Sequence, residues 1–174
     1  AYTVSRPFNV VLPAALSDVA GDFLAFILSA DGRQVIADNG YIAIDGAAPA
    51  YEASGLSGKL TVGGSSSVTP VMEKLAEAYE ALNAGVSVEI QMSDSTTGIT
   101  GAAEGNFDIG MASRELKDAE LALGITGVRI AIDGIAVIVN PENTVDAIAK
   151  ETVMLIYTGE ITDYRFYPAV FRSH

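Results

Sequence analysis

The hydrophobic pattern before residue 46 predicts one strand followed by two helices. Residues 8–12 are mostly apolar and are closed by Pro13, as in a short buried strand. Ser17 can cap a helix that we expect to end near residues 31–32, and a second short helix should stop at residues 39–40. The apolar face of the first helix is made of Val19, Phe23, Phe26 and Ile27.

Residues 59–140 continue with alternating strand and helix patterns. Residues 60–62 form a strand candidate, and Thr69 then opens a helix in which Pro70 suits the first position. Residues 86–91 alternate between apolar and polar side chains, which indicates a half-buried strand. Further apolar, β-rich segments follow at residues 107–112, 128–133 and 134–139. This alternation predicts an α/β domain in which helices cover a sheet.

Two stretches lack any such periodicity. Residues 46–58 are rich in Ala, Gly, Ser and Pro, and we assign residues 47–58 as a linker between the segments 1–46 and 59–140. In the tail, residues 164–174, the last three residues (Arg172, Ser173 and His174) look like the start of an expression tag, so the tail carries no functional argument. The remaining chain is expected to form one compact domain.

Hydroxyl groups and one arginine follow three of the predicted strands. They lie in residues 63–67 (Gly-Gly-Ser-Ser-Ser), in residues 93–98 (Ser-Asp-Ser-Thr-Thr-Gly) and at Ser113 and Arg114. Ligands bind at the carboxyl ends of the strands in open α/β sheets, and Gly-rich turns at helix starts present N–H groups to anions. Each loop alone is ambiguous, because such turns often only link a strand to a helix and a lone arginine is usually a solvated charge. Together the three loops predict an oxyanion site.

The composition narrows the possible functions. With 174 residues, of which 49% are hydrophobic, the chain can bury a core. Ten basic residues against 22 acidic ones give a net charge of −12, which disfavours nucleic acid and anionic membranes as partners. The absence of cysteine excludes disulfides, thiol catalysis and cysteine-ligated zinc. No apolar run reaches the roughly 18 residues of a membrane span.

Enzyme chemistry has little support in the sequence. The one histidine, His174, is the last residue, so a Ser-His-Asp arrangement is disfavoured. Neither the G-x-S-x-G pattern nor the lysine-containing phosphate-loop pattern occurs. Asp118 and Glu120 lie in what looks like a polar turn, where solvated carboxylates are common. We therefore predict a binding protein without a catalytic site, metal or cofactor.

Three sequence blocks resemble one known family. They are similar, in order and spacing, to the opening of the phosphate-binding protein of ABC phosphate transporters, a member of the type II superfamily of periplasmic solute-binding proteins. These blocks are residues 60–70, 93–98 and 107–116. Residues 133–140 resemble the crossover strand that leaves the first lobe of that family. Residues 150–163 resemble the first helix beyond the crossover, with Tyr164 where the family usually has Trp.

The order of the matching segments is unusual for the family. Residues 5–8 and 23–41 resemble the far end of such proteins, although they come first here. The resemblance implies that residues 1–46 correspond to the C-terminal part of the first lobe and residues 59–140 to the N-terminal part of the same lobe. Residues 141–163 would begin the second lobe. This order is expected either at the junction of two tandem units or in an engineered circular permutation.

The resemblance implies a fold and a site. The fold is one lobe of a periplasmic-binding-protein-like α/β three-layer sandwich with a mixed, mostly parallel sheet. The implied phosphate-binding positions are Ser66, Ser67, Val68, Ser95, Thr96, Thr97, Ser113, Arg114 and Asp133. Ser113 falls where some relatives have a carboxylate that accepts a proton from hydrogen phosphate. Asp133 could be that acceptor, a partner for Arg114 or part of a structural turn, so discrimination against sulfate is left open.

The implied function is the binding of inorganic phosphate outside the cytoplasm, in the periplasm or at the cell surface, for delivery to an ABC transporter permease. The export signal is expected to be absent from this chain. The resemblance implies that most of the second lobe, where the family has an Arg and a Ser-Gly-Thr element, lies outside this sequence, so we expect weak binding. One alternative is a scaffold or assembly module with a vestigial site. It could dimerise or exchange strands through the surface around the Val139 strand and the helix containing Val153, Leu155 and Ile156. Another alternative is a site for a different tetrahedral oxyanion such as sulfate.

Overall fold

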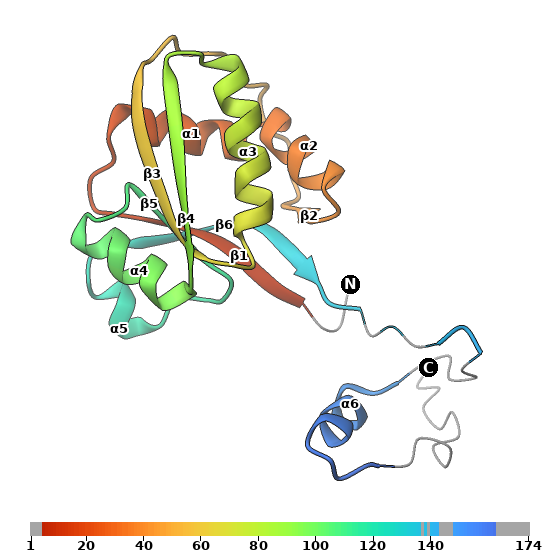
Figure 1. Ribbon diagram of the computed structural model, residues 1–174. Helices are drawn as coiled ribbons and strands as arrows, with labels where there is room; N and C mark the ends of the chain where they lie inside the picture. Colours follow the sequence, from red (N-terminus) through yellow and green to blue (C-terminus); the bar gives the residue numbers. More distant parts are fainter. Residues whose placement is uncertain (1–4, 137, 139, 143–147, 163–174) are drawn as a thin grey trace. The chain divides into compact units, whose positions relative to one another are not determined.

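The computed structural model describes residues 5–136, 138, 140–142 and 148–162. The chain divides into two compact units, of which Ser5–Gly134 is the larger (Figure 1). The elements of this unit are β1 (Ser5–Leu12), α1 (Asp18–Leu28), α2 (Ala30–Asp38), β2 (Ile42–Ala43), β3 (Gly58–Ser65), α3 (Thr69–Leu82), β4 (Val86–Ser93), α4 (Ser95–Glu104), β5 (Ile109–Ala112), α5 (Asp118–Leu121) and β6 (Thr126–Gly134).

The six strands form one mixed sheet with the order β2-β6-β1-β5-β3-β4. β3 pairs in parallel with β4 and β5, whereas β1 is antiparallel to both β5 and β6, and β2 is antiparallel to β6. Two of the five pairings are therefore parallel, so the sheet is mixed as predicted, but it is less parallel than expected. The reason is that the two strands before the linker, β1 and β2, run against the four strands that follow it.

Helices cover both faces of the sheet, which confirms the predicted layered α/β architecture. Alternate side chains of a strand point to opposite faces, and β1 shows this directly. Val10 packs into the larger core cluster, with residues of α1, α2 and α3. Val11 packs into the smaller cluster, with Ile99 and Ala102 of α4. β1 lies between β5 and β6, so the segment before the linker supplies a central strand to a sheet made mostly by the segment after it.

One hydroxyl group ends α1 and begins α2. The Ser29 Oγ donates to the Phe26 carbonyl at 2.7 Å and accepts from the Gly32 N–H at 3.2 Å. The expected helix end near residues 31–32 was therefore wrong, since both residues lie in the first turn of α2. Gly32 permits this sharp turn because a Cβ there would lie 2.2 Å from the Phe26 carbonyl oxygen. The predicted stop of the second helix at residues 39–40 is confirmed, with Asn39 as its C-cap.

The predicted linker, residues 47–58, contains no helix or strand apart from Gly58, the first residue of β3, yet it packs against the helices. Tyr51 makes the main contacts: its N–H donates to the Asp31 carboxylate and its hydroxyl donates to the Asp22 Oδ2, both at 2.6 Å. The same Asp22 oxygen also accepts from the Tyr79 hydroxyl at 2.6 Å and from Ser54 at 2.9 Å. Burial and the neighbouring carboxylate raise the pKa of Tyr79, so its hydroxyl remains a donor. The linker is thus hydrogen-bonded to α1 and α2, and the shared Asp22 oxygen connects it to Tyr79 of α3.

The second unit contains α6 (Lys150–Tyr157), which confirms the helix predicted around Val153, Leu155 and Ile156. No side chain of α6 is fully buried. The β-rich pattern at 134–139 does not continue the sheet at Ile135 and Ala136, while residues 137 and 139 and the tail 164–174 lie outside the described residues. Within the described part of the chain, no helix has the length and apolar character needed to cross a membrane.

Candidate functional site

Three glycines bring the predicted site loops together. β3, β4 and β5 are parallel neighbours, so the loops after them leave the same edge of the sheet. A Cβ on Gly98 of α4 would lie 2.4 Å from the Met111 carbonyl oxygen and 2.9 Å from the Gly64 Cα. A Cβ on Gly110 would lie 2.3 Å from the Gly98 carbonyl oxygen. Only glycine allows this close approach, which presses the first turn of α4 onto the ends of β3 and β5.

Ser95 and Ser113 form the centre of the candidate site. The two Oγ atoms lie 3.3 Å apart, and the Ser95 Oγ also accepts from the Ser113 N–H at 3.1 Å. The Arg114 Nη2 lies 3.3 Å from the Thr96 Oγ1, to which it donates. The structure therefore brings together four predicted residues from the start of α4 and the end of β5. They offer hydroxyl groups and one guanidinium, which suits an oxyanion.

Asp94 occupies backbone donors that the sequence assigned to the ligand. Its side chain caps α4 by accepting from the N–H groups of Thr96, at 2.8 Å, and Thr97, at 3.1 Å. It also accepts from the Thr97 hydroxyl at 2.7 Å, and the bonds from Thr97 and Thr96 lower the pKa of Asp94. An anion at this helix start would meet the hydroxyl of Thr96 more readily than these two N–H groups. An Asp directly before a Ser-Thr-Thr run is an N-cap signal that sequence reasoning could have used.

The turn after β3 is closed by hydrogen bonds within the protein. The Ser66 N–H donates to the Ser93 carbonyl at 2.9 Å, and the Val68 N–H donates to the Ser65 carbonyl at 3.0 Å. Val68 is fully buried, whereas Ser66 is exposed and Ser67 is half-buried. The hydroxyls of Ser66 and Ser67 are thus better placed to meet a ligand than the N–H groups of Ser66 and Val68.

Arg114 has an acidic partner that the sequence did not identify. Its Nη2 lies 2.7 Å from the Glu120 Oε1 and its Nη1 lies 2.8 Å from the Glu120 Oε2. The predicted polar turn around Glu120 is the short helix α5, and hydrogen bonding to Arg114 lowers the pKa of Glu120 to about 2. A second missed residue is Asn9, a buried polar side chain in the apolar β1, whose Nδ2 donates to the Arg114 carbonyl at 2.8 Å.

Asp133 lies on β6, which is separated from β5 by β1. It is near the end of β6 and forms an ion pair with Arg6, the residue opposite it on β1, at 2.8 Å. The sequence allowed a pairing of Asp133 with Arg114, and this alternative was wrong, because Arg114 pairs with Glu120 and Asp133 pairs with Arg6. The cause is the strand order, since β1 separates β6 from β5.

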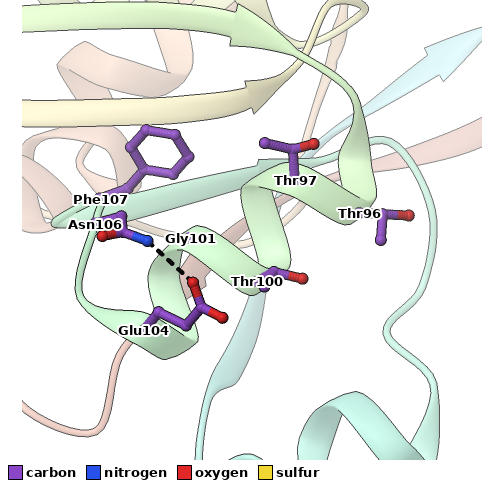
Figure 2. Close-up of a pocket in the computed structure, with 7 residues that line it drawn as sticks. All are labelled: Thr96, Thr97, Thr100, Gly101, Glu104, Asn106 and Phe107. Carbon is purple, nitrogen blue, oxygen red and sulfur yellow. Dashed lines mark hydrogen bonds between the residues drawn. The ribbon is translucent and has the colours of Figure 1, made fainter.

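A separate pocket of about 280 Å³ opens along α4. Its lining residues are Thr96, Thr97, Thr100, Gly101, Glu104, Asn106 and Phe107. Figure 2 shows the Glu104 and Asn106 side chains joined by a hydrogen bond, 3.0 Å long, with the Phe107 ring above them. This pocket shares only Thr96 and Thr97 with the predicted site. In the part of the chain that the structure describes, no three His, Asp or Glu side chains are grouped to hold a metal ion.

Comparisons with known proteins identify the family. Residues 49–165 match a family model described as a PBP superfamily domain. The chain belongs to the PBP superfamily. Among curated relatives, the phosphate-binding protein PstS 2 of Streptococcus agalactiae is 51% identical over 164 residues, which cover 94% of this chain and 56% of the relative. PstS 2 of Streptococcus pneumoniae is 42% identical over 163 residues, with the same coverage of 94% and 56%.

Two solved structures of phosphate transport proteins are also similar to this chain. A phosphate-binding protein of a phosphate ABC transporter from Streptococcus pneumoniae TIGR4 has a TM-score of 0.88 and 42% identity, over 92% of this chain and 62% of that one. A putative phosphate ABC transporter substrate-binding protein from Clostridium perfringens, solved with bound phosphate, has a TM-score of 0.54 and 44% identity, over 62% of this chain and 44% of that one. The predicted resemblance and fold class are confirmed by these matches.

The PBP relatives also bear on the order of the segments. An alignment that covers 94% of the chain includes residues on both sides of the linker. The succession of the two segments therefore also occurs in natural streptococcal proteins. The chain spans about 56% of the length of these curated relatives.

Proposed function

We propose that this chain forms one lobe of an extracytoplasmic solute-binding protein that binds inorganic phosphate for an ABC transporter. The observation that carries the proposal is the meeting of the Ser95 and Ser113 hydroxyls, 3.3 Å apart, beside Arg114. The relatives named phosphate-binding protein PstS 2 support the choice of phosphate. Delivery to a transporter permease and a location outside the cytoplasm belong to the same proposal, and the similar phosphate-binding protein of a phosphate ABC transporter supports the transport role.

The proposed phosphate contacts come from three loops at one sheet edge. The contributing residues are Ser66, Ser67, Ser95, Thr96, Thr97, Ser113 and Arg114. Val68 could contribute only its backbone N–H, which would have to leave the Ser65 carbonyl. Hydroxyl and guanidinium groups donate to phosphate oxygens, and the guanidinium adds a charge-assisted bond. Asp133 belongs to the proposal only as the acceptor of a ligand proton, a role that would compete with its ion pair to Arg6.

The net charge of −12 does not oppose this proposal. Salt screens the field of exposed charges beyond about 8 Å, whereas hydrogen bonds act at contact distance. The isolated chain should nevertheless bind weakly, roughly in the millimolar range, because each charge-assisted bond that a second lobe would add contributes about 1.5–3 kcal/mol. Submicromolar affinity for phosphate in this chain would refute the expectation of weak binding.

The proposal is tested by titrating phosphate and sulfate into the purified chain by calorimetry. Ser67→Ala and Arg114→Ala each remove one proposed donor and should reduce the phosphate signal. Arg129→Ala is the matched control, because it also removes one positive charge from an arginine paired with a glutamate, in this case Glu115. Equal losses in all three variants, or no binding of either anion at high millimolar concentration, would contradict a phosphate half-site.

A second candidate function is assembly, for which α6 supplies the specific observation. Met154 is 57% exposed and Tyr157 is 87% exposed, and no residue of this helix is fully buried. Exposed apolar side chains favour association, so we propose that a scaffold with a vestigial site forms a homodimer through this helix. Light scattering over a range of concentrations tests this, and a strict monomer throughout would refute it.

A further inference from the structure

We propose that Glu120 is a positioning residue of the oxyanion site, which holds the Arg114 guanidinium in place for the ligand. This inference rests on the proposed function. Glu120 lies on α5, outside the three loops that carry the proposed phosphate contacts. Its role would therefore be indirect: it orders Arg114 before the anion arrives.

The four terminal N–H groups of Arg114 all have acceptors in the described structure. Two of them donate to the Glu120 carboxylate, at 2.7 and 2.8 Å. The Nη1 also donates to the Glu115 carbonyl at 3.1 Å, and the Nη2 donates to the Thr96 hydroxyl at 3.3 Å. The longest of these contacts, to Thr96, faces the hydroxyl cluster of the site. A phosphate oxygen could thus replace the Thr96 hydroxyl while the paired contacts to Glu120 persist.

Glu120 itself is fixed, so it can act as a support. Its Oε2 accepts from the Lys117 N–H at 2.8 Å, which ties the carboxylate to the first turn of α5. Its side chain is 16% exposed, and the hydrogen bond from Arg114 keeps the pKa of the carboxyl far below neutrality. At the other end of the arginine, Asn9 holds the backbone carbonyl of Arg114. Both ends of this long side chain are therefore restrained before any ligand binds.

Positioning and simple electrostatics predict opposite effects of removing Glu120. Without its carboxylate the positive charge of Arg114 is uncompensated, so attraction alone predicts tighter binding of an anion. If Glu120 positions Arg114, the freed side chain must instead lose its rotamer freedom when the ligand binds, and binding weakens. The direction of the change decides between the two roles.

The binding experiment is an NMR titration of the full 174-residue chain with inorganic phosphate. We expect the dissociation constant to rise about 3- to 10-fold in Glu120→Ala, the factor that corresponds to immobilising one flexible side chain. Glu120→Gln keeps one acceptor and should fall between the wild type and Glu120→Ala. Asp118→Asn is the matched control, since it removes the same charge from an exposed position of α5 and should leave the dissociation constant unchanged. Equal or tighter binding by Glu120→Ala would overturn the inference.

The second measurement needs no ligand and separates this inference from the proposed function. Side-chain Nε and Nη signals of Arg114 should report a rigid, hindered guanidinium in the wild type and in Asp118→Asn, and a mobile one in Glu120→Ala. Unchanged Arg114 signals in a folded Glu120→Ala variant would overturn the positioning role. Failure of the wild type to bind phosphate would instead overturn the proposed function, while the mobility of Arg114 still decides whether Glu120 orders it.

Discussion

The hydroxyl oxygens of Ser95 and Ser113 lie 3.3 Å apart, although 18 positions separate the two residues in the sequence. Ser95 opens α4 and Ser113 follows β5, so their meeting depends on how the helix packs against the strand. The pair is also asymmetric, because the Ser95 Oγ accepts the Ser113 N–H whereas the Ser113 Oγ supports no backbone group in the described contacts.

This asymmetry predicts different effects of removing each hydroxyl. Ser95→Ala leaves the Ser113 N–H without its acceptor and should lower the free energy of unfolding by about 1 kcal/mol or more. Ser113→Ala should lower the free energy of unfolding by about 0.5 kcal/mol at most, because no backbone N–H group loses its acceptor. Urea unfolding of both variants measures the difference. Equal destabilisation would show that the bond to the Ser113 N–H contributes little.

The close packing at Gly98 predicts that even one methyl group disturbs the site. In Gly98→Ala the new Cβ would lie 2.4 Å from the Met111 carbonyl oxygen, so α4 must shift, at a cost of about 3 kcal/mol or more. Gly21→Ala is the control, since Gly21 lies inside α1 with no atom within 4 Å of the added Cβ. There we expect a gain of about 0.5–1 kcal/mol from helix propensity. Thermal unfolding compares the two, and a neutral Gly98→Ala would contradict the packing argument.

The docked linker predicts a stabilising role for the Tyr51 hydroxyl. Tyr51→Phe removes one of the three hydrogen bonds to the Asp22 Oδ2 and should lower the free energy of unfolding by about 1.5 kcal/mol. Tyr157→Phe, at a position that is 87% exposed, should change it by less than about 0.5 kcal/mol. Chemical unfolding followed by circular dichroism measures both. If the linker only tethers the two segments, neither substitution should change the free energy of unfolding by more than about 0.5 kcal/mol.

The Glu120 carboxyl predicts a pH dependence of stability. The hydrogen bond from Arg114 is the main cause that lowers its pKa in the folded chain to about 2, from the usual 4.5 of a glutamate. A lowered pKa means that the contribution is fully present above the unfolded value and is lost as the pH falls through the folded value. The stability difference between the wild type and Glu120→Gln should thus be constant near neutral pH and shrink from about pH 4.5 towards pH 2. Urea midpoints at several pH values test this, and a difference that does not vary with pH would contradict it.

The ion pair between Asp133 and Arg6 predicts that removing the Asp133 charge lowers stability and leaves anion binding unchanged. Because the two side chains are 21% and 41% exposed, Asp133→Asn should cost no more than about 1 kcal/mol of stability. With Asp133 held by Arg6, we expect the preference for phosphate over sulfate to be unchanged. Competition titrations with both anions measure that preference. If Asp133→Asn abolishes the preference for phosphate over sulfate, Asp133 is instead the acceptor of the ligand proton.

Much of the fold could be read from local patterns. The caps at Ser17 and Asn39, the Pro70 helix start and the alternation in residues 86–91 predicted elements that the structure contains. The boundary between α1 and α2 was missed because Ser29 serves both helices, so the apolar periodicity runs across it without a break. In the site, the hydroxyl-rich loops were visible as sequence blocks, but the capping role of Asp94 was not used.

By itself, the sequence determined the α/β alternation, the starts of α1 and α3 and the three polar loops, since these depend on side-chain periodicity and capping between near neighbours. Only the tertiary structure decided that β1 and β2 run against the later strands, that Tyr51 ties the linker to Asp22, and that Arg114 pairs with Glu120 while Asp133 pairs with Arg6. The reason is physical. Hydrogen bonds and ion pairs act over a few ångströms, so their partners are set by strand order and helix packing, which no local pattern of residues specifies.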